Sequence, residues 1–312
     1  MINIALIGFG SIGLKYFKLL KKNKNFNIIK VLRKKNYINK KSSFVKFYSN
    51  KNKFFLKNKK DIHAYIVASP INTHYQYIKK ILAKRKPLII EKPIVKNVNE
   101  LNKIVRLSSN INCPVLVNHS DLYSPAFQKL KKDIKLIGKY KKIKITFGKF
   151  QKIYKIYKKP DILFPYFDWL PHPLAISIKL AGYPKKIKIL SKKINIKKKI
   201  IFQKLHIKLF CKQKIIDIFF SNNYKFPKRR IEIHGDKGSI NYDLYKKKSL
   251  ILKIKNKKKI SYSFQNMSPL ENLLKIFYNA IKDKKRISDI NLSIKVMKII
   301  FFIQKKINIE IS

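Results

Sequence analysis

Three of the eight glycines in this 312-residue chain lie close together near its start. The stretch Gly8-Phe9-Gly10-Ser11-Ile12-Gly13 has the spacing G-x-G-x-x-G. It follows the apolar run 4–7, which predicts a buried strand, and it opens a helical pattern; residues 26–32 predict the next strand. The order strand, glycine turn, helix, strand is typical of a domain built on a parallel sheet, and it is the context in which this spacing is informative.

Each glycine has a separate physical task in such a turn. Gly8 permits the tight bend, Gly10 lets the backbone approach a pyrophosphate, and Gly13 lets the helix pack closely on the strand. The N-terminus of the helix offers N–H donors and a partial positive charge to the phosphates. We therefore expect a dinucleotide site here; a glycine turn without a ligand is the alternative.

Arg33 bears on the choice of dinucleotide. An acid about twenty residues after the glycines binds the ribose of NAD, whereas an arginine accommodates the 2′-phosphate of NADP. This chain has Arg33-Lys34-Lys35 in that place. Because only six of the 74 basic residues are arginine, Arg33 is more informative than its neighbours. We expect NADP(H) to be favoured over NAD(H).

The pattern of predicted strands changes once along the chain. In residues 1–118 strands alternate with helices, which predicts an α/β Rossmann domain with a doubly wound parallel sheet. Residues 119–312 predict an α+β domain with a mostly antiparallel open sheet, for substrate binding and oligomerisation. The predicted strands are 4–7, 26–32, 45–48, 64–68, 88–90 and 114–117, then 142–147, 185–194, 199–211, 215–221, 230–234, 250–254 and 260–264.

The formal net charge of +59 would ordinarily suggest a nucleic acid or a membrane surface as partner. Here, however, 68 of the basic residues are lysines spread along the whole chain, and Ile, Asn, Phe and Tyr are also abundant. All of these residues have A/T-rich codons, so an A/T-rich genome explains the charge. We expect no specific nucleic-acid partner; a basic nucleic-acid binder is the less favoured alternative.

The remaining bulk features predict a cytoplasmic protein. The sequence has no uncharged apolar run of about 18 residues, so no membrane partner is expected. The chain enters a strand at once, without room for a signal peptide. Cys113 and Cys211 lie far apart in apolar surroundings, as free thiols do in a reducing compartment. No metal site is predicted.

One lysine differs from the others by its position. The apolar run 88–90 predicts a buried parallel strand, and Glu91, Lys92 and Pro93 follow it directly. Open α/β sheets bind their ligands at the carboxyl ends of the strands. Lys92 is therefore expected near the chemistry, whereas most other lysines are expected at the surface.

A second candidate site lies in residues 167–174, which contain the one tryptophan of the chain. Asp168 and His172 are four residues apart at the predicted start of an apolar helix, so both can face one pocket. In the alternative, structural interpretation, Asp168 caps the helix and His172 is an ordinary surface residue. The pair alone does not decide between the two.

Taken in order, these features resemble the Gfo/Idh/MocA family of NAD(P)-dependent oxidoreductases, named for glucose–fructose oxidoreductase and inositol dehydrogenase. The resemblance extends over nearly the whole chain. The segments that carry it are 8–13, Ala68-Ser69-Pro70 with Asn72-Thr73-His74, Glu91-Lys92-Pro93, 117–119 with Tyr123-Ser124-Pro125, Asp168 with His172, and 231–239. It implies a Rossmann domain followed by a substrate domain whose open sheet often forms a dimer interface, and hence a homodimer or homotetramer.

The resemblance also implies an activity, namely hydride transfer between the nicotinamide and a secondary alcohol or ketone of a sugar, cyclitol or sugar nucleotide. The Asp-Trp-x-Pro-His form of 168–172 is similar to members from surface-polysaccharide pathways. Lys92 would bind the reacting hydroxyl, His172 would carry the proton, and Asp168 would orient the substrate. Leu170 stands where many members have glycine, which leaves His119 as a substitute base and substrate-binding residue.

The residues that the resemblance and the glycine pattern place at the cofactor can be stated together. They are Gly8, Phe9, Gly10, Ser11, Ile12, Gly13, Arg33, Ser69, Pro70, Asn72, His74, Glu91 and Lys92. The same residues permit another interpretation, in which the chain is a dinucleotide-binding regulator or partner protein that has the fold without turnover.

Overall fold

A computed structural model describes residues 1–33, 45–56, 62–151, 153–154, 165–197, 200–246, 249–264 and 268–308. It divides into two compact units. The first unit is Met1–Asn118 with Leu270–Met297, and the second unit is His119–Pro269 with Lys298–Ser312. Each unit therefore draws on two separate stretches of the chain.

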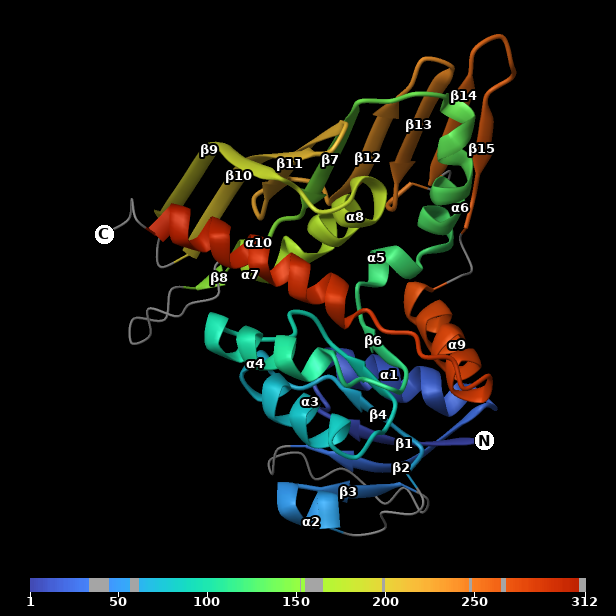
Figure 1. The fold of residues 1–312 in the computed structure, drawn as a ribbon, viewed down its shortest axis with the longest axis vertical. Helices are drawn as coiled ribbons and strands as arrows, with labels where there is room; N and C mark the ends of the chain where they lie inside the picture. Colours follow the sequence, from blue (N-terminus) through green and yellow to red (C-terminus); the bar gives the residue numbers. More distant parts are fainter. Residues whose placement is uncertain are drawn as a thin grey trace. The chain divides into compact units, whose positions relative to one another are not determined.

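The first unit is built on a six-stranded sheet in which every neighbouring pair is parallel. Its order is β3-β2-β1-β4-β5-β6 (Figure 1). The strands are β1 (Ile2–Ile7), β2 (Phe26–Leu32), β3 (Lys46–Tyr48), β4 (Ala64–Val67), β5 (Leu88–Ile90) and β6 (Val115–Val117). The predicted doubly wound sheet is confirmed. Its order reverses between β1 and β4, where the carboxyl ends of such sheets bind ligands.

Helices connect these strands. They are α1 (Ser11–Lys22), α2 (Lys51–Leu56), α3 (His74–Leu82), preceded by the short helix η1 (Ile71–Thr73), and α4 (Val98–Ser108). The start of α4 shows why the chain turns helical there. The Asn97 side chain accepts the N–H of Glu100 at 2.9 Å, and the Glu100 carboxylate accepts the N–H of Lys96 at 3.1 Å. These two bonds satisfy amide donors that a helix N-terminus would otherwise leave unpaired.

The chain returns to the first unit through α9 (Pro269–Lys282) and the start of α10 (Ile290–Asn308). Between these helices the backbone pairs with the edge strand β6. The Val115 amide donates to the Ile287 carbonyl at 2.8 Å, and the Val115 carbonyl accepts the Asp289 amide at 2.9 Å. This pairing covers polar groups on the outer edge of β6.

The second unit is built on a nine-stranded sheet, ordered β15-β14-β13-β12-β7-β11-β10-β8, with β9 also paired to β10. All pairs are antiparallel except β7 with β11, which confirms the mostly antiparallel prediction. The strands are β7 (Lys142–Gly148), β8 (Ile153–Tyr154), β9 (Lys186–Lys197), β10 (Ile200–Cys211), β11 (Lys214–Ser221), β12 (Lys228–His234), β13 (Gly238–Asp243), β14 (Leu250–Ile254) and β15 (Ile260–Tyr262). Strand β13 was not predicted, because Gly238 and Asn241 are of types that strands disfavour.

Helices cover one face of this second sheet. They are α5 (Ser120–Tyr123), α6 (Pro125–Asp133), continued by the short helix η2 (Ile134–Ile137), α7 (Pro165–Trp169) and α8 (Pro171–Ala181). Helix α6 packs on β13 and β14, α7 on β10, and α8 on β11 (Figure 1). The alternation in β7 follows from this: Ile143 and Ile145 are fully buried, whereas Lys142 and Lys144 are exposed.

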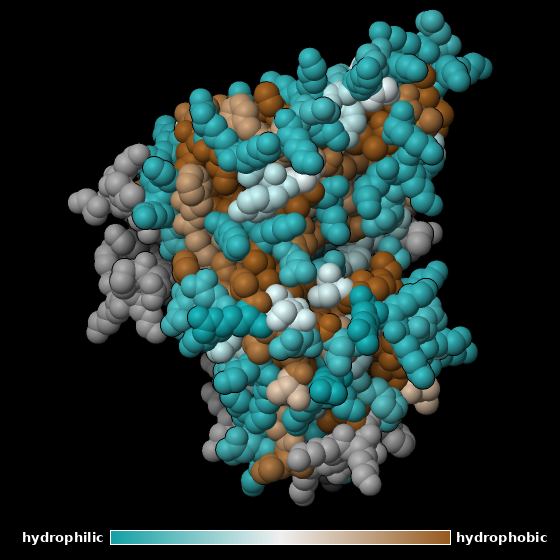
Figure 2. All heavy atoms as spheres, in the orientation of Figure 1, coloured by the Kyte–Doolittle hydropathy of each residue, from teal (hydrophilic) through white to brown (hydrophobic). Residues whose placement is uncertain are grey.

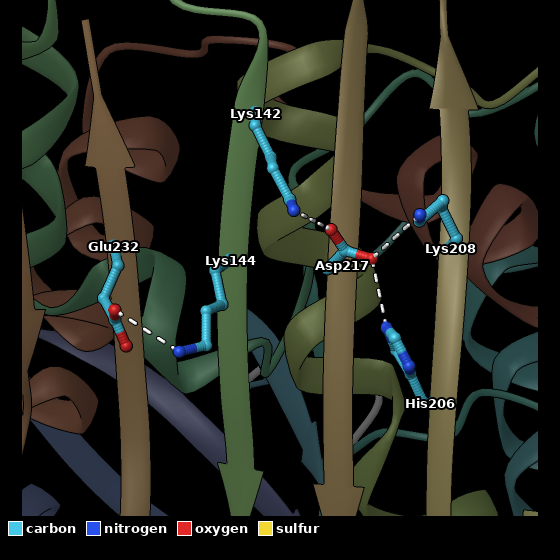
Figure 3. A network of polar contacts seen from close by, with 6 residues as sticks. All are labelled: Lys142, Lys144, His206, Lys208, Asp217 and Glu232. Atoms are coloured by element: carbon cyan, nitrogen blue, oxygen red, sulfur yellow. Dashed lines mark hydrogen bonds and ion pairs between the residues drawn. The ribbon is translucent and has the colours of Figure 1, made fainter. Parts of the chain in front are cut away.

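The opposite face of the sheet, which we call the open face, carries ion pairs. In Figure 3 these side chains project in front of the strands, and the helices lie behind them. Asp217 lies at the centre, with its carboxylate 3.1 Å from His206 Nε2, 3.2 Å from Lys142 Nζ and 3.8 Å from Lys208 Nζ. A polar open face of this kind is typical of an antiparallel sheet with helices on one side only.

The surface agrees with the dispersed composition. On the face shown in Figure 2, hydrophilic and hydrophobic residues are interspersed. In the part of the chain that the structure describes, no helix has both the length and the apolar content needed to cross a lipid bilayer.

Candidate active site

The three glycines of the turn after β1 have different surroundings, which match their predicted tasks. Gly8 has a φ of +97°, and a Cβ there would lie 2.4 Å from the Ala68 carbonyl oxygen. A Cβ on Gly13 would lie 2.2 Å from the Gly8 carbonyl oxygen. A Cβ on Gly10 would meet no atom within 4 Å. Gly8 and Gly13 are therefore required for packing, whereas Gly10 faces open space where a pyrophosphate fits.

Helix α1 begins directly after this turn, with Gly10 at its N-cap. Gly10 has no side chain to accept the amide donors of the first helical turn, and that turn contains no acid. Unsatisfied N–H groups and the positive end of the helix dipole favour an anion at this position. The turn and helix thus fit the phosphates of a dinucleotide.

Arg33 lies beside the same turn, at the carboxyl end of β2. The Gly8 amide donates to the Leu32 carbonyl at 2.9 Å, which places the two chain segments next to each other. The Arg33 guanidinium carbon lies 4.6 Å from the centre of the Phe47 ring, and that ring lies 5.5 Å from Phe9. The Phe47 ring therefore holds the Arg33 cation near the glycine turn.

The turn after β4 is tied to the loop after β5 by one buried histidine. His74 Nε2 lies 2.7 Å from the Ser69 carbonyl oxygen, and His74 Nδ1 lies 2.8 Å from the Pro93 carbonyl oxygen. Burial lowers the pKa of His74, although both carbonyl contacts oppose this, and the nearby Lys92 charge lowers it further. Pro70 and Asn72 of the same turn are exposed.

Glu91 holds together elements at the carboxyl end of the first sheet. It is buried, and its Oε1 accepts the Tyr16 hydroxyl at 3.1 Å and the Asn118 side-chain amide at 2.5 Å. It thereby joins α1 to the end of β6. Lys92 follows, half-buried, with a cis peptide bond to Pro93. The structure therefore gathers the glycine turn, Arg33, the 69–74 turn and the 91–93 loop at one edge of the first sheet.

In the second unit, His172 forms a buried ion pair with an acid that the sequence did not single out. His172 Nδ1 lies 2.6 Å from Asp121 Oδ2, and Arg229 Nη1 lies 3.0 Å from Asp121 Oδ1. The Asp121 side chain is only 2% exposed. Asp121 is on α5, His172 on α8 and Arg229 on β12, so three elements bring the charges together.

Aromatic rings surround this cluster. The His172 ring stacks on Phe147 with ring centres 5.4 Å apart and an interplanar angle of 16°. The Arg229 guanidinium carbon lies 5.0 Å from the Phe147 ring centre and 5.6 Å from that of Trp169. The indole of Trp169 is fixed in turn, because its Nε1 donates to Gln151 at 2.7 Å. The His172 ring and the Arg229 guanidinium are therefore both held in place by aromatic rings.

The charges in the cluster stabilise one another. Burial would raise the pKa of Asp121, but Arg229 and His172 outweigh it and hold that pKa well below its usual range. Burial would lower the pKa of Arg229, but Asp121 raises it. Burial raises the pKa of Tyr242, which lies near the same carboxylate. Asp121 is thus an ionised carboxylate in a desolvated setting.

The other two predicted substrate residues lie on neighbouring elements of the second unit. Asp168 is half-buried on α7, and His119 is buried at the N-cap of α5. Their proposed roles stay predictions. Asp121 and Arg229 were not singled out from the sequence. Their rarity was the available signal, since Arg229 is one of only six arginines and Asp121 is one of 15 acids. Among the described residues, no three His, Cys, Asp or Glu side chains are grouped so that they could hold a metal ion.

Comparison with known proteins agrees with this arrangement. Residues 2–119 match the model of the GFO_IDH_MocA family, described as an oxidoreductase family with an NAD-binding Rossmann fold. The resemblance to this family is therefore confirmed over residues 2–119, where the family model describes an NAD-binding Rossmann fold. An uncharacterized protein of Saccharomyces cerevisiae is 24% identical over 200 residues, which are 60% of this chain and 56% of that protein. The chain thus spans little more than half of that relative.

Solved structures share the fold over nearly the whole chain. An oxidoreductase from Agrobacterium radiobacter in complex with NAD⁺, L-tartaric acid and magnesium has a TM-score of 0.76 at 17% identity, covering 95% of this chain and 93% of that one. The UDP-N-acetylglucosamine 3-dehydrogenase of Acidithiobacillus ferrooxidans gives 0.75 at 15%, covering 95% and 94%. The biliverdin reductase of Synechocystis, in complex with biliverdin and NADP⁺, gives 0.74 at 13%, covering 95% and 96%. At these identities the likeness shows the fold alone.

Proposed function

We propose that the chain transfers hydride between NADP(H), in preference to NAD(H), and a secondary alcohol or ketone of a sugar, cyclitol or sugar nucleotide. The observation that carries this proposal is the buried ion pair of His172 with Asp121, at 2.6 Å. A protein that only senses a dinucleotide has no need for a desolvated acid–imidazole pair. Such a pair does suit a residue that moves protons.

The chemistry assigns a role to each residue. In the oxidative direction the substrate carbon loses a hydride, its hydroxyl loses a proton, and a C=O bond forms. A bound nicotinamide would accept the hydride. Lys92 stabilises the negative charge that develops on the oxygen, and His172 receives the proton. Because Nδ1 of His172 is engaged with Asp121, Nε2 is the atom that carries the proton.

The first unit would bind the dinucleotide and the second the substrate. The open space at Gly10 and the position of Arg33 beside the turn support the cofactor and its 2′-phosphate. The sugar-type substrate rests on the resemblance and on the Asp-Trp-x-Pro-His form of 168–172. Surface-polysaccharide biosynthesis is the pathway that we favour. Asp168 and His119 would contact the substrate together with Lys92 and His172.

A fluorescence screen of NADPH and NADH oxidation, and of the reverse reaction, against sugars, cyclitols and sugar nucleotides tests the proposal. Lys92→Ala and His172→Ala should each lower turnover by about 10²-fold or more while the dinucleotide still binds. Unchanged turnover in both variants would remove these residues from the reaction. Dinucleotide binding without turnover of any substrate would favour the regulator alternative, and no dinucleotide binding would refute both.

We also propose a homodimer or homotetramer in the cytoplasm. The open face of the second sheet supports an assembly, since it presents charged side chains, among them the pairs of Lys142 with Asp217 and of Lys144 with Glu232 (Figure 3). Light scattering at low and high salt tests it; a monomer at every concentration would refute it. Cys113 and Cys211 are both free and buried, as expected in a reducing compartment.

A further inference from the structure

One buried carboxylate in the second unit is contacted by two basic side chains. Asp121 Oδ2 lies 2.6 Å from His172 Nδ1, and Asp121 Oδ1 accepts a hydrogen bond from Arg229 Nη1 at 3.0 Å. Each oxygen of the carboxylate therefore faces a different basic group. The side chains of Asp121 and His172 are 2% and 7% exposed, so water screens these charges little.

The pair of Asp121 with His172 alone would create a difficulty for proton transfer. A buried carboxylate in contact with an imidazole favours the protonated ring. A ring that stays protonated cannot act as a base, and a proton carrier needs both forms near the working pH. Something must oppose the effect of Asp121.

Arg229 is placed to do so. Its charge neutralises the carboxylate before His172 takes up a proton, so protonation of His172 adds a second positive charge against one negative charge. In the part of the chain that the structure describes, Arg229 Nε is buried without a hydrogen-bond partner, and the ion pair of this guanidinium is with Asp121. The rings of Phe147 and Trp169 prevent the cation from swinging away.

We propose that Asp121 and Arg229 are a pair of positioning residues that set the protonation of His172 in opposite directions. Asp121 orients the ring and favours its charged form, and Arg229 disfavours that form. The functional meaning of this inference rests on the proposed role of His172 in proton transfer. The ionised state of Asp121, with its pKa held low by both cations, agrees with the geometry.

Other titratable groups lie on the elements around His172. Tyr242 is neutral at ordinary pH, because burial raises its pKa, so it contributes no charge. Lys149 lies over the Trp169 ring, with its Nζ 5.1 Å from the ring centre. The remaining groups are His119 and Tyr123 around α5, Asp133 on α6 and Asp168 on α7. None of these is exchanged in the variants below except Tyr242, which serves as the control.

The titration of His172 by NMR tests the inference without any substrate. The six histidines are labelled with ¹³C, and the His172 signal is assigned by its loss in His172→Asn. Asp121→Asn should move the titration midpoint of His172 to lower pH, and Arg229→Met should move it to higher pH, each by about one pH unit or more. A merely structural role would not give shifts of opposite sign.

Matched controls keep the test decisive. Arg229→Lys retains the positive charge and should leave the titration midpoint of His172 close to that of the wild type. Tyr242→Phe removes the hydroxyl of a buried, uncharged neighbour and should also leave that midpoint unchanged. Should Asp121→Asn fail to fold, the comparison of Arg229→Met with Arg229→Lys decides alone. Equal midpoints in that comparison, or shifts of the same sign in Asp121→Asn and Arg229→Met, would overturn the inference.

The pH dependence of turnover then separates this inference from the proposed function. If His172 carries the proton, the limb of the pH–rate profile that reports it should move with the NMR midpoint in each variant. NMR shifts of opposite sign with an unmoved pH–rate profile would support the charge coupling and refute the role of His172 in the reaction.

Discussion

Gly13→Ala should lower the stability of the protein, whereas Gly10→Ala should lower its affinity for the dinucleotide, because the two glycines have different surroundings. A Cβ on Gly13 would lie 2.2 Å from the Gly8 carbonyl oxygen, whereas ordinary contacts begin at 3.4 Å. More than 1 Å of separation would have to be opened between α1 and the backbone of the turn. Overpacking of this kind costs about 1–3 kcal/mol. For a chain of this size 2 kcal/mol lowers Tm by about 4–8 °C.

Gly10→Ala should leave the unliganded protein intact. Its φ of −77° and ψ of −164° are extended backbone that alanine adopts, and no atom lies within 4 Å of the new Cβ. A stability change of about +0.4 to +1 kcal/mol, or none, is expected. The added methyl group nevertheless stands where the pyrophosphate would approach. We expect at least about a tenfold loss of dinucleotide affinity, which corresponds to about 1.4 kcal/mol.

Thermal melting without ligand and fluorescence titration with NADPH measure the two effects separately. We expect a destabilised Gly13→Ala variant and a stable Gly10→Ala variant that binds NADPH weakly. A Gly10→Ala variant that binds as tightly as the wild type would show that the dinucleotide lies elsewhere. A Gly13→Ala variant of unchanged stability would show that the close approach of helix and turn is not required.

Three further predictions concern single residues. Arg33→Asp should lower the NADPH-to-NADH affinity ratio by about tenfold or more, because it replaces a cation by a repelling anion; an unchanged ratio would exclude Arg33 from the site. His74→Phe removes both carbonyl contacts of the ring and should lower the free energy of unfolding by about 1–3 kcal/mol. Because burial lowers the pKa of His74, the free energy of unfolding of the wild type should also fall as pH drops below about 6.5. Urea unfolding of the variant at several pH values should show no such dependence on pH. Asp121→Asn leaves the buried Arg229 guanidinium without its carboxylate and should cost about 3–5 kcal/mol, and an equally stable variant would contradict the buried ion pair. Since the pKa of Asp121 is lowered on folding, the wild type should lose this stabilisation as pH falls below about 3.9.

The first sheet was predictable because its signals are local. Short apolar runs followed by turn residues identify parallel strands, and the parallel order then places the carboxyl ends of β4 and β5 side by side. The hydrogen bond of His74 to the Pro93 carbonyl confirms that neighbourhood. Strand β13 was missed since its glycine and asparagine weaken the pattern, and its place is fixed by pairing with β12 and β14.

The cluster around His172 could not be predicted from spacing. Asp121 and Arg229 are 108 residues apart, and neither stands in a motif that points to the other. The sequence instead paired His172 with Asp168, which is four residues away. Proximity in the chain is a weak guide here, because the packing of α5, α8 and β12 on one sheet decides which charges meet.

The scarcity of acids makes their positions more informative than those of the lysines. With 15 acidic and 74 basic residues, almost any exposed acid finds a lysine by chance, as the exposed Asp283 shows by lying 2.9 Å from Lys285. Burial of a carboxylate is different, because its desolvation costs several kcal/mol and must be offset by well-placed donors. Glu91 and Asp121 are 8% and 2% exposed, and each binds two partners from distant parts of the chain. Glu91 adjoins Lys92, and Asp121 binds His172. Lys92 and His172, the two residues proposed for the reaction, are therefore each next to a buried acid. This neighbour distinguishes Lys92 from the many lysines that are explained by the biased composition alone.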